Sequence, residues 1–436
     1  MKKIFLFIAV LAAGICTVYA DAGSDRTTFS LSLSEALELG IKNNLDLQNS
    51  QIDVKSKTLD AATSWNKILS SSVGVSYSNT LAKYETVPKE DFSVGAGTLS
   101  VKLDNSININ AANIYGIINA VNDYHDGKLS YENAKATLVK NIKQSYFNLI
   151  LMRQQIEIAE MEAANAKVAF ETAQMKYRDG MVSQVDLLKS ELSYKTMLPA
   201  LDEKINSYIN ASVDFKRIIG VNNRSRLQLT TQIPENVPDA MSKIRNTDFK
   251  NGLDANYTIQ TYIRRLKTAV NNRNLAILNM TTPSVSLSHS LGINPLSENI
   301  ISNTVSVSAS FKINTPLPFS SEQVSVAKNV YNLKKAQNDL ANAREQQFID
   351  LMKKINNVEH YEKNIAIDEL NVQIAEKTFQ MEESLYKANS VSFLDYEDAK
   401  KKLSDARYSL AKDINAYLSA IFEIEYLLNM EIVDIE

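Results

Sequence analysis

The chain has 436 residues, and its 47 Lys and Arg nearly balance 50 Asp and Glu, so no basic surface indicates a nucleic-acid partner. It contains only 12 Gly and 8 Pro, where average usage predicts about 52 of the two together. An α/β enzyme of this length needs many Gly-punctuated turns, so a doubly wound sheet or a TIM barrel is disfavoured. The composition favours an elongated helical protein.

Residues 1–20 are typical of a cleaved secretory signal. Two lysines are followed by an apolar stretch and by Val18-Tyr19-Ala20, which has small residues at the positions that precede cleavage. The only cysteine, Cys16, lies inside this segment. Lipidation of Cys16 is the alternative, but Ile15 is larger than a lipobox usually allows. The mature chain is therefore expected to be exported without disulfides.

The first half of the mature chain, residues 21–219, predicts a helix, a β-hairpin and a helical hairpin. The helix spans 33–69, and strands at 72–80 and 98–107 are joined by a polar loop that contains Pro88, Gly95 and Gly97. Helices at 110–179 and 183–219 follow. The stretch 128–179 contains neither Gly nor Pro, which favours one uninterrupted helix.

The second half, residues 251–436, predicts the same order of elements. After a further helix, strands at 284–292 and 304–314 are joined across Pro295, and helices at 321–388 and 392–430 follow. The region 220–250 separates the halves, and its Gly220, Pro234 and Pro238 indicate a linker of mixed local structure.

Self-similarity between the halves supports this division. The segment 170–186 matches 379–395 at an offset of 209, 72–78 matches 284–290 at 212, and 100–104 matches 310–314 at 210. Three blocks in one order at nearly constant spacing indicate a duplicated unit.

The best-matched block predicts a tight turn between two helices, near 180 in one half and near 389 in the other. Gly180 and Asn389 are residue types that tolerate a left-handed backbone at a helix C-terminus. Ser183 and Ser392 are candidate N-caps for the next helix, each with an aspartate three residues on.

The strand blocks alternate strictly between apolar and polar residues, so each strand has one apolar and one polar face. Outside the N-terminus the chain has no run of 18 apolar residues that would make a transmembrane helix. Strands can enter a membrane only as a closed barrel, and four strands are too few for one. Several protomers must therefore supply the strands.

Catalytic and metal-binding patterns are not found, so an enzyme is not predicted, and no cofactor or metal is expected. His125, His289 and His360 are isolated in the sequence, which supports neither a zinc site nor a catalytic triad. The one Gly-x-Gly, Gly95 to Gly97, lies in a predicted loop and lacks the third glycine of a dinucleotide-binding motif.

The ordered set of motifs resembles the TolC-type outer-membrane efflux proteins over about residues 30–430. The similarity rests on the duplicated unit, on Leu33-Ser34-Glu35-Ala36-Leu37 followed by Asn43-Asn44-Leu45-Asp46-Leu47, and on the Tyr-x-x-Gly-x-Val-Ser-x-x-Asp turn that begins at Tyr177. The resemblance implies a mainly α fold with a small β part. Long antiparallel coiled-coil helices of three protomers form an α-barrel tunnel, and two β-hairpins per protomer contribute to a 12-strand transmembrane β-barrel.

The resemblance also implies a function and partners. Such proteins are passive exit ducts of tripartite efflux pumps or type I secretion systems, located in the outer membrane and extending into the periplasm. They are homotrimers that contact outer-membrane lipid, a periplasmic adaptor (membrane fusion) protein and an inner-membrane pump of the RND or ABC type. The region 220–250 is expected to form part of an equatorial belt.

The resemblance places the turns 177–186 and 386–395 at the periplasmic tip, in an outer and an inner helical hairpin respectively. Asp395 and Asp398 match carboxylates that ring the family's constriction. Their spacing of three residues puts both on one helix face. A ring of acids makes a pore cation-selective. The alternative is that Asp395 only caps its helix and Asp398 is a solvated charge.

The family's latch departs from its usual form in this chain. In the archetype, a tyrosine and a basic residue of the inner hairpin bond to an acid of the neighbouring outer hairpin. Tyr386 and Asp186 match the tyrosine and the acid, but the basic position is Val391. The alternative basic residue on the inner hairpin is Lys387.

The residues of the two turns are candidate contacts for the adaptor. A purely structural role is the alternative for each, because tight turns need Gly, Asn and Ser in any case. Phe170 and Phe379 are expected to pack within the coiled coil. The candidates are Gly180, Met181, Val182, Ser183, Asn389, Ser390, Val391 and Ser392.

A second function class stays open at this point, namely an exported periplasmic or surface coiled-coil protein with a structural or adhesive role. The amphipathic strands argue against it, because a soluble coiled coil has no use for them.

Overall fold

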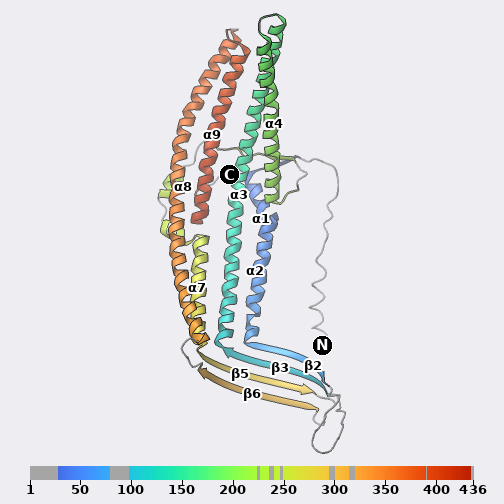
Figure 1. Cartoon of the computed structure of the whole chain (residues 1–436), viewed down its shortest axis with the longest axis vertical. Coiled ribbons are helices and arrows are strands. Elements are labelled where there is room, and N and C mark those ends of the chain that lie inside the picture. Colours follow the sequence, from blue (N-terminus) through green and yellow to red (C-terminus); the bar gives the residue numbers. More distant parts are fainter. Residues whose placement is uncertain are drawn as a thin grey trace, which may run out of the picture.

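The computed structural model describes residues 28–78, 98–222, 226–234, 240–245, 249–293, 300–313, 320–388 and 390–433. The expected signal segment with Cys16, the loops that contain Pro88 and Pro295, and Asn389 lie outside these residues. The molecule is long and narrow, with a sheet at one end, helical turns at the other and the C-terminus near the middle (Figure 1).

Two helical hairpins make up most of this length. The first consists of α3 (Ala111–Arg178) and α4 (Gln184–Ile219), and the second of α8 (Ser321–Lys387) and α9 (Phe393–Leu428). α3 has 68 residues and α8 has 67, which at about 1.5 Å per residue gives roughly 100 Å each. These bounds confirm the four predicted helices to within two residues. None of the described helices is both long enough and apolar enough to cross a membrane.

The prediction of one helix over 33–69 is wrong, because the chain breaks at Asn44. α1 (Leu33–Asn43) and α2 (Leu45–Thr63) are separate helices, and a short 3-10 helix, η1 (Ser64–Lys67), follows. The Asn44 backbone is extended, and its side-chain oxygen accepts the N–H of Leu47 at 2.9 Å, so Asn44 caps α2. Its amide nitrogen donates to the carbonyl of Ile218 at 2.8 Å, which fastens the break to the end of α4.

The sheet at one end has four strands in the order β2-β3-β5-β6 (Figure 1). β2 (Leu69–Ser78) pairs with β3 (Thr98–Asn110), and β5 (Thr281–Ile293) pairs with β6 (Ile301–Ile313). These are the two predicted hairpins, with longer strands than the sequence indicated. Antiparallel pairing of β3 with β5 joins the two halves of the chain.

The sheet has one apolar and one hydroxyl-rich face, as the alternation predicted. The register places odd-numbered residues of all four strands on one face and even-numbered residues on the other. On the odd-numbered face, Val75 is 69% exposed and Val307 is 75% exposed. On the other face, serines of paired strands bond at 2.6–2.7 Å, as in Ser76–Ser100 and Ser286–Ser308.

The two β-hairpins do not pair in equivalent register. Ser72 pairs with Asp104, and the sequence repeat makes Ser284 and Asn314 their counterparts. Ser284 pairs instead with Ser310, four residues earlier. Because side chains alternate with a period of two, this even shift keeps the apolar and hydroxyl-rich faces of both hairpins aligned.

A belt near the middle of the molecule contains elements that the sequence did not indicate. β1 (Thr28–Leu31) pairs in parallel with β4 (Arg226–Leu229), and α5 (Ala240–Arg245) lies in the same predicted linker as β4. The phenol of Tyr146 joins the two segments, because its hydroxyl donates to the carbonyl of Leu31 at 2.8 Å and accepts the N–H of Thr231 at 3.0 Å.

The remaining helices, α6 (Phe249–Asp254) and α7 (Tyr257–Leu278), lie between α5 and β5 in the chain. The main hydrophobic core lies around the belt. It combines side chains from α1, α3, α4, α5, α7, α8 and α9 with Ile432 and Val433 of the C-terminal segment. The belt is therefore where the helices of the two halves are packed together.

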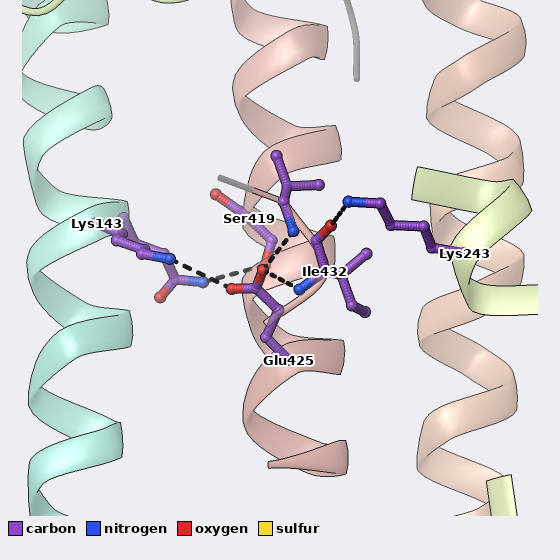
Figure 2. A network of polar contacts seen from close by, with 7 residues as sticks. Lys143, Lys243, Ser419, Glu425 and Ile432 are labelled. Carbon is purple, nitrogen blue, oxygen red and sulfur yellow. Dashed lines mark hydrogen bonds and ion pairs between the residues drawn. The ribbon is translucent and has the colours of Figure 1, made fainter. Parts of the chain in front are cut away.

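The carboxylate of Glu425, a largely buried side chain, binds the C-terminal segment to this belt (Figure 2). One oxygen of Glu425 accepts the backbone N–H groups of Ile432 and Val433, each at 2.9 Å, and the other lies 3.4 Å from the ammonium of Lys143 on α3. Lys243 of α5 donates to the carbonyl of Ile432 at 2.8 Å. α3, α5, α9 and the C-terminal segment thus meet in one polar network.

Candidate functional site

The first helical turn lies at the end of the molecule opposite the sheet, between α3 and α4 (Figure 1). Gly180 has φ +71°, which confirms the predicted left-handed residue. The N–H of Gly180 bonds to the carbonyl of Tyr177 and that of Met181 to the carbonyl of Lys176, which is a Schellman C-cap. Ser183 then caps α4, because its hydroxyl accepts the N–H of Asp186 at 3.2 Å.

The second helical turn, between α8 and α9, closes in the same way. The N–H of Ser390 bonds to the carbonyl of Leu385 at 2.8 Å, the spacing seen between Met181 and Lys176 in the first turn. Ser392 caps α9 in a reciprocal box with Asp395. The predicted N-caps Ser183 and Ser392 are both confirmed, whereas Asn389 itself lies outside the described residues.

Hydrogen bonds at the two caps keep the turn carboxylates ionised. The Ser392 hydroxyl donates to Asp395 at 2.7 Å and its backbone N–H at 3.2 Å, and both bonds lower the pKa of Asp395. The Ser183 hydroxyl likewise lowers the pKa of Asp186. Both aspartates are exposed and act as capping acids in the single protomer.

Other candidate gate residues have their partners within the second helical hairpin. Asp398 lies 2.7 Å from the ammonium of Lys402 on the same helix. Lys387 lies 2.9 Å from Glu383, also one turn away on the same helix. The ring of Tyr386 stacks on Tyr396 with centroids 5.1 Å apart.

The aromatic residues below the turns pack within their own hairpins, as expected. Phe170 stacks on Tyr194 of α4 at 6.2 Å, and Phe379 lies 5.6 Å from Tyr396 of α9. Met181 is 73% exposed at the apex of the first turn. The turns therefore present a capped backbone, and among their described apolar side chains Met181 has the largest exposed fraction.

Polar contacts also join the two helical hairpins, and none of them was predicted from the sequence. Lys401 of α9 lies 3.0 Å from Glu162 of α3, and Gln155 of α3 bonds to the phenol of Tyr408. No local motif marks these residues, and only the antiparallel register of α3 and α9 would have brought them together. In the part of the chain that the structure describes, no group of three or more His, Cys, Asp or Glu is placed to hold a metal.

Comparison with known proteins relates this architecture to a family. The model of the outer membrane efflux protein family matches residues 37–221 and 279–429. These ranges cover most of the chain and include both helical turns and all four strands of the main sheet. No match is found among curated protein sequences.

Solved structures share the fold at low sequence identity. The Campylobacter jejuni CmeC outer membrane channel is 15% identical, with a TM-score of 0.74, over 94% of this chain and 90% of that one. The outer membrane protein VceC of Vibrio cholerae is 13% identical, with a TM-score of 0.67, over 92% of this chain and 97% of that one. The open state of the Neisseria gonorrhoeae MtrE outer membrane channel is 12% identical, with a TM-score of 0.67, over 91% and 89%.

The family match confirms the resemblance that the opening motif and the turn motif indicated. It also agrees with the long helical hairpins and the small sheet described above. The chain belongs to the outer membrane efflux protein family and is an outer-membrane channel whose helical part extends into the periplasm.

Proposed function

We propose that three copies of this chain form the exit duct of a tripartite efflux pump or a type I secretion system. The sheet is the observation that carries this proposal. Its odd-numbered face is apolar and exposed, its even-numbered face is rich in hydroxyls, and among the described strands β2 and β6 each pair on one side only. In lipid these edges must be paired, so β6 of one copy joins β2 of the next and three copies close twelve strands.

Exposed apolar residues at heptad spacing on the helices support the same assembly. On α2, Leu45, Ile52 and Leu59 are 71%, 59% and 67% exposed. On α8, Ile367, Ile374 and Met381 are 58%, 65% and 54% exposed and also lie seven residues apart. Such stripes are typical of helices that pack against a partner helix. In the proposed trimer, neighbouring copies pack against one another through these stripes, and their helices together form the wall of the duct.

In this duct the two helical turns lie at the periplasmic tip. The first helical hairpin is the outer one and the second is the inner one, and Asp395 and Asp398 of three copies ring the entrance. Asp186 and Tyr386 face each other between neighbouring copies. The adaptor docks on the turns, through residues 180–183 and 389–392. In this proposal the chain consists of two structural repeats, residues 21–219 and 251–436, and the region 220–250 between them belongs to the belt. The duct has no chemistry of its own.

Conductance in a planar bilayer tests the proposal. The purified chain is expected to form cation-selective channels, and replacing both Asp395 and Asp398 with alanine is expected to weaken that selectivity and block by multivalent cations. Unchanged selectivity would contradict the gate assignment, and absence of any conductance would contradict the duct.

Crosslinking in cells tests the partners. Cysteines placed at Met181 and Ser390 are expected to trap a periplasmic adaptor together with its pump, because both positions lie at the helical turns. Asp214 near the end of α4 is exposed and adjoins the buried belt residue Phe215, and a cysteine there serves as the control. Equal trapping from all three positions would count against docking at the tip.

The pH dependence of selectivity follows from the cap of α9. An Asp with an ordinary pKa of about 3.9 begins to lose charge as pH falls toward 5. The bonds from Ser392 lower the pKa of Asp395, so its charge and the stabilising cap persist to lower pH and are lost only as pH falls through that lowered value. Cation selectivity is therefore expected to resist acidification in the native channel.

Replacing Ser392 with alanine supplies the comparison. Without the hydroxyl, the pKa of Asp395 returns toward its ordinary value, so selectivity should decline at a higher pH than in the native channel. Reversal potentials recorded across a pH series measure this shift. Identical pH profiles for the two channels would show that Asp395 does not set the selectivity.

A further inference from the structure

A pocket lies between α2 and α3, at the end of these helices that adjoins the sheet (Figure 1). Its volume is about 660 Å³, and α2 with η1 forms one wall while the first turns of α3 form the other. η1 ends at Lys67 just before β2 begins at Leu69, and α3 follows β3 directly. In the proposed duct the pocket therefore lies where the strands leave the hydrocarbon region of the membrane.

A lysine at the sheet end of the pocket lies across a glycine of α3. The ammonium of Lys67 donates to the carbonyl of Gly116 at 3.2 Å, and a Cβ atom on Gly116 would stand 3.0 Å from the Cδ and Nζ atoms of that lysine. Glycine is unfavourable in a helix interior, but here it leaves room for the lysine stem. An ammonium has three N–H donors, so Lys67 keeps two of them for a further acceptor.

Acceptors line the pocket farther from the sheet. Asn119 lies three residues beyond Gly116 on α3, which is about 4.5 Å along the helix. Its Oδ1 atom is buried and has no hydrogen-bond partner among the described residues. Burying an amide oxygen without a donor is unfavourable, so the pocket favours a ligand that supplies an N–H group there. The exposed carboxylates of Asp60 and Asp123 also line the pocket.

The only tryptophan of the chain lies at the same level. Trp65 is part of η1, between the pocket residues Ser64 and Lys67, and is 63% exposed. Indole rings are enriched at membrane–water interfaces, at the depth of the lipid headgroups. The headgroup region adds about 5–8 Å on each side of the hydrocarbon core, and Gly116 lies about 9 Å along α3 from the end of β3. Trp65 and Lys67 are thus at headgroup depth in the proposed duct.

The charges of the pocket indicate which class of headgroup fits. Two lysines and two aspartates line it, so it carries no net charge that would favour an anionic lipid. These four residues are Lys57, Lys67, Asp60 and Asp123. An ethanolamine headgroup has its phosphate next to the hydrocarbon and its ammonium beyond, which is the order of Lys67 and Asn119 from the sheet.

We infer that this pocket binds the headgroup of a phosphatidylethanolamine of the periplasmic leaflet, with the phosphate on Lys67 and the ammonium on Asn119 and Asp60. This inference rests on the insertion of the sheet into the membrane that the proposed function requires.

Tryptophan fluorescence of the full-length protein in bilayers tests the inference, because Trp65 alone supplies the signal. The probes are phospholipids brominated near the start of their acyl chains, which quench an adjacent indole, each mixed into a phosphatidylcholine bilayer. The quaternary ammonium of phosphatidylcholine has no N–H to donate to Asn119. Because one hydrogen bond contributes about a fivefold change in an equilibrium constant, brominated phosphatidylethanolamine is expected to associate about five times more strongly than brominated phosphatidylcholine.

Variants that retain Trp65 separate the two parts of the headgroup. Asn119→Leu removes the acceptor and is expected to reduce the fivefold preference to about one. Lys67→Gln removes the phosphate partner and is expected to lower, about tenfold, the preference for phosphatidylethanolamine over brominated diacylglycerol, which lacks a phosphate. Lys55→Gln, the matched control, removes a charge from an exposed position of α2 outside the pocket lining and should leave both preferences unchanged.

The outcomes distinguish the headgroup site from the duct. Equal quenching by brominated phosphatidylethanolamine and phosphatidylcholine, or stronger quenching by brominated phosphatidylglycerol, would overturn the site and leave the duct in place. Absence of quenching by every probe would also overturn the site, and conductance of the same protein in a planar bilayer would then show that the duct stands without it. A chain that neither conducts nor is quenched would overturn both.

Discussion

Replacing Glu425 with alanine is expected to destabilise the protein by about 3–5 kcal/mol, the usual result of removing one partner from a buried ion pair. Lys143 and Glu425 have side chains that are each 11% exposed. The variant strands the Lys143 ammonium next to the Phe422 ring, 4.9 Å from its centroid, and also deprives the N–H groups of Ile432 and Val433 of their acceptor. The midpoint of urea unfolding, followed by circular dichroism, measures the loss.

Two further variants isolate the cause of that effect. Glu423, two residues away on α9, pairs with Lys354 at a more exposed site, and Glu423→Ala is expected to cost less than about 1 kcal/mol. Glu425→Gln combined with Lys143→Met keeps an acceptor for the C-terminal N–H groups and leaves no unpaired charge. The double variant should therefore be more stable than Glu425→Ala, and equal loss in the two would contradict this account of the network.

Introducing arginine at Val307 is expected to block insertion of the sheet into the membrane, at a cost of about 2–4 kcal/mol if the residue lies near the bilayer midplane. Val307 lies in the middle of β6, is 75% exposed, and pairs with Leu287 on the apolar face. A charged guanidinium at this position must be transferred from water into the hydrocarbon region of the bilayer, which is unfavourable. The amount of folded trimer in the outer-membrane fraction, read as a heat-resistant band on a gel, measures insertion.

The matched control for this experiment is the adjacent residue. Ser306 precedes Val307 on the same strand and points to the hydroxyl-rich face, where it pairs with Ser288. Ser306→Arg adds the same side chain at the neighbouring position of the strand but on the hydroxyl-rich face, which faces water in the proposed duct. It should assemble normally, and failure of both variants to the same degree would show that the two faces of the sheet are not distinguished by lipid.

Local periodicity predicted most of this fold. The alternation in β2, β3, β5 and β6 and the Gly-free and Pro-free runs of α3 and α8 are properties of neighbouring residues, which a sequence displays directly. The break at Asn44 was missed because an asparagine that ends one helix and caps the next looks like any polar helical residue. Asn44 caps α2 through the Leu47 N–H, and its second bond, to the carbonyl of Ile218, joins it to a residue 174 positions away in the sequence.

In the candidate site, the turn and cap residues were predicted from the sequence, whereas the ion pairs between helices were not. Gly180, Ser183 and Ser392 were recognised because turns and caps have local residue preferences. The ion-pair partners of Glu162 and Glu425, Lys401 and Lys143, were not predicted, since each lies more than 200 residues away and neither pair belongs to a motif. An ion pair across an antiparallel seam depends on how two helices are aligned, which no short window of sequence contains.

The pairing of β3 with β5 also bears on the order in which the protein folds. β3 ends at Asn110 and β5 begins at Thr281, so roughly 170 residues separate the two central strands of the sheet. During export the strands β2 and β3 therefore emerge well before β5, and their apolar residues and unpaired backbone groups are open to other chains until it arrives. During export this interval is a period of aggregation risk, and we expect nascent chains to depend on periplasmic chaperones until β5 has arrived.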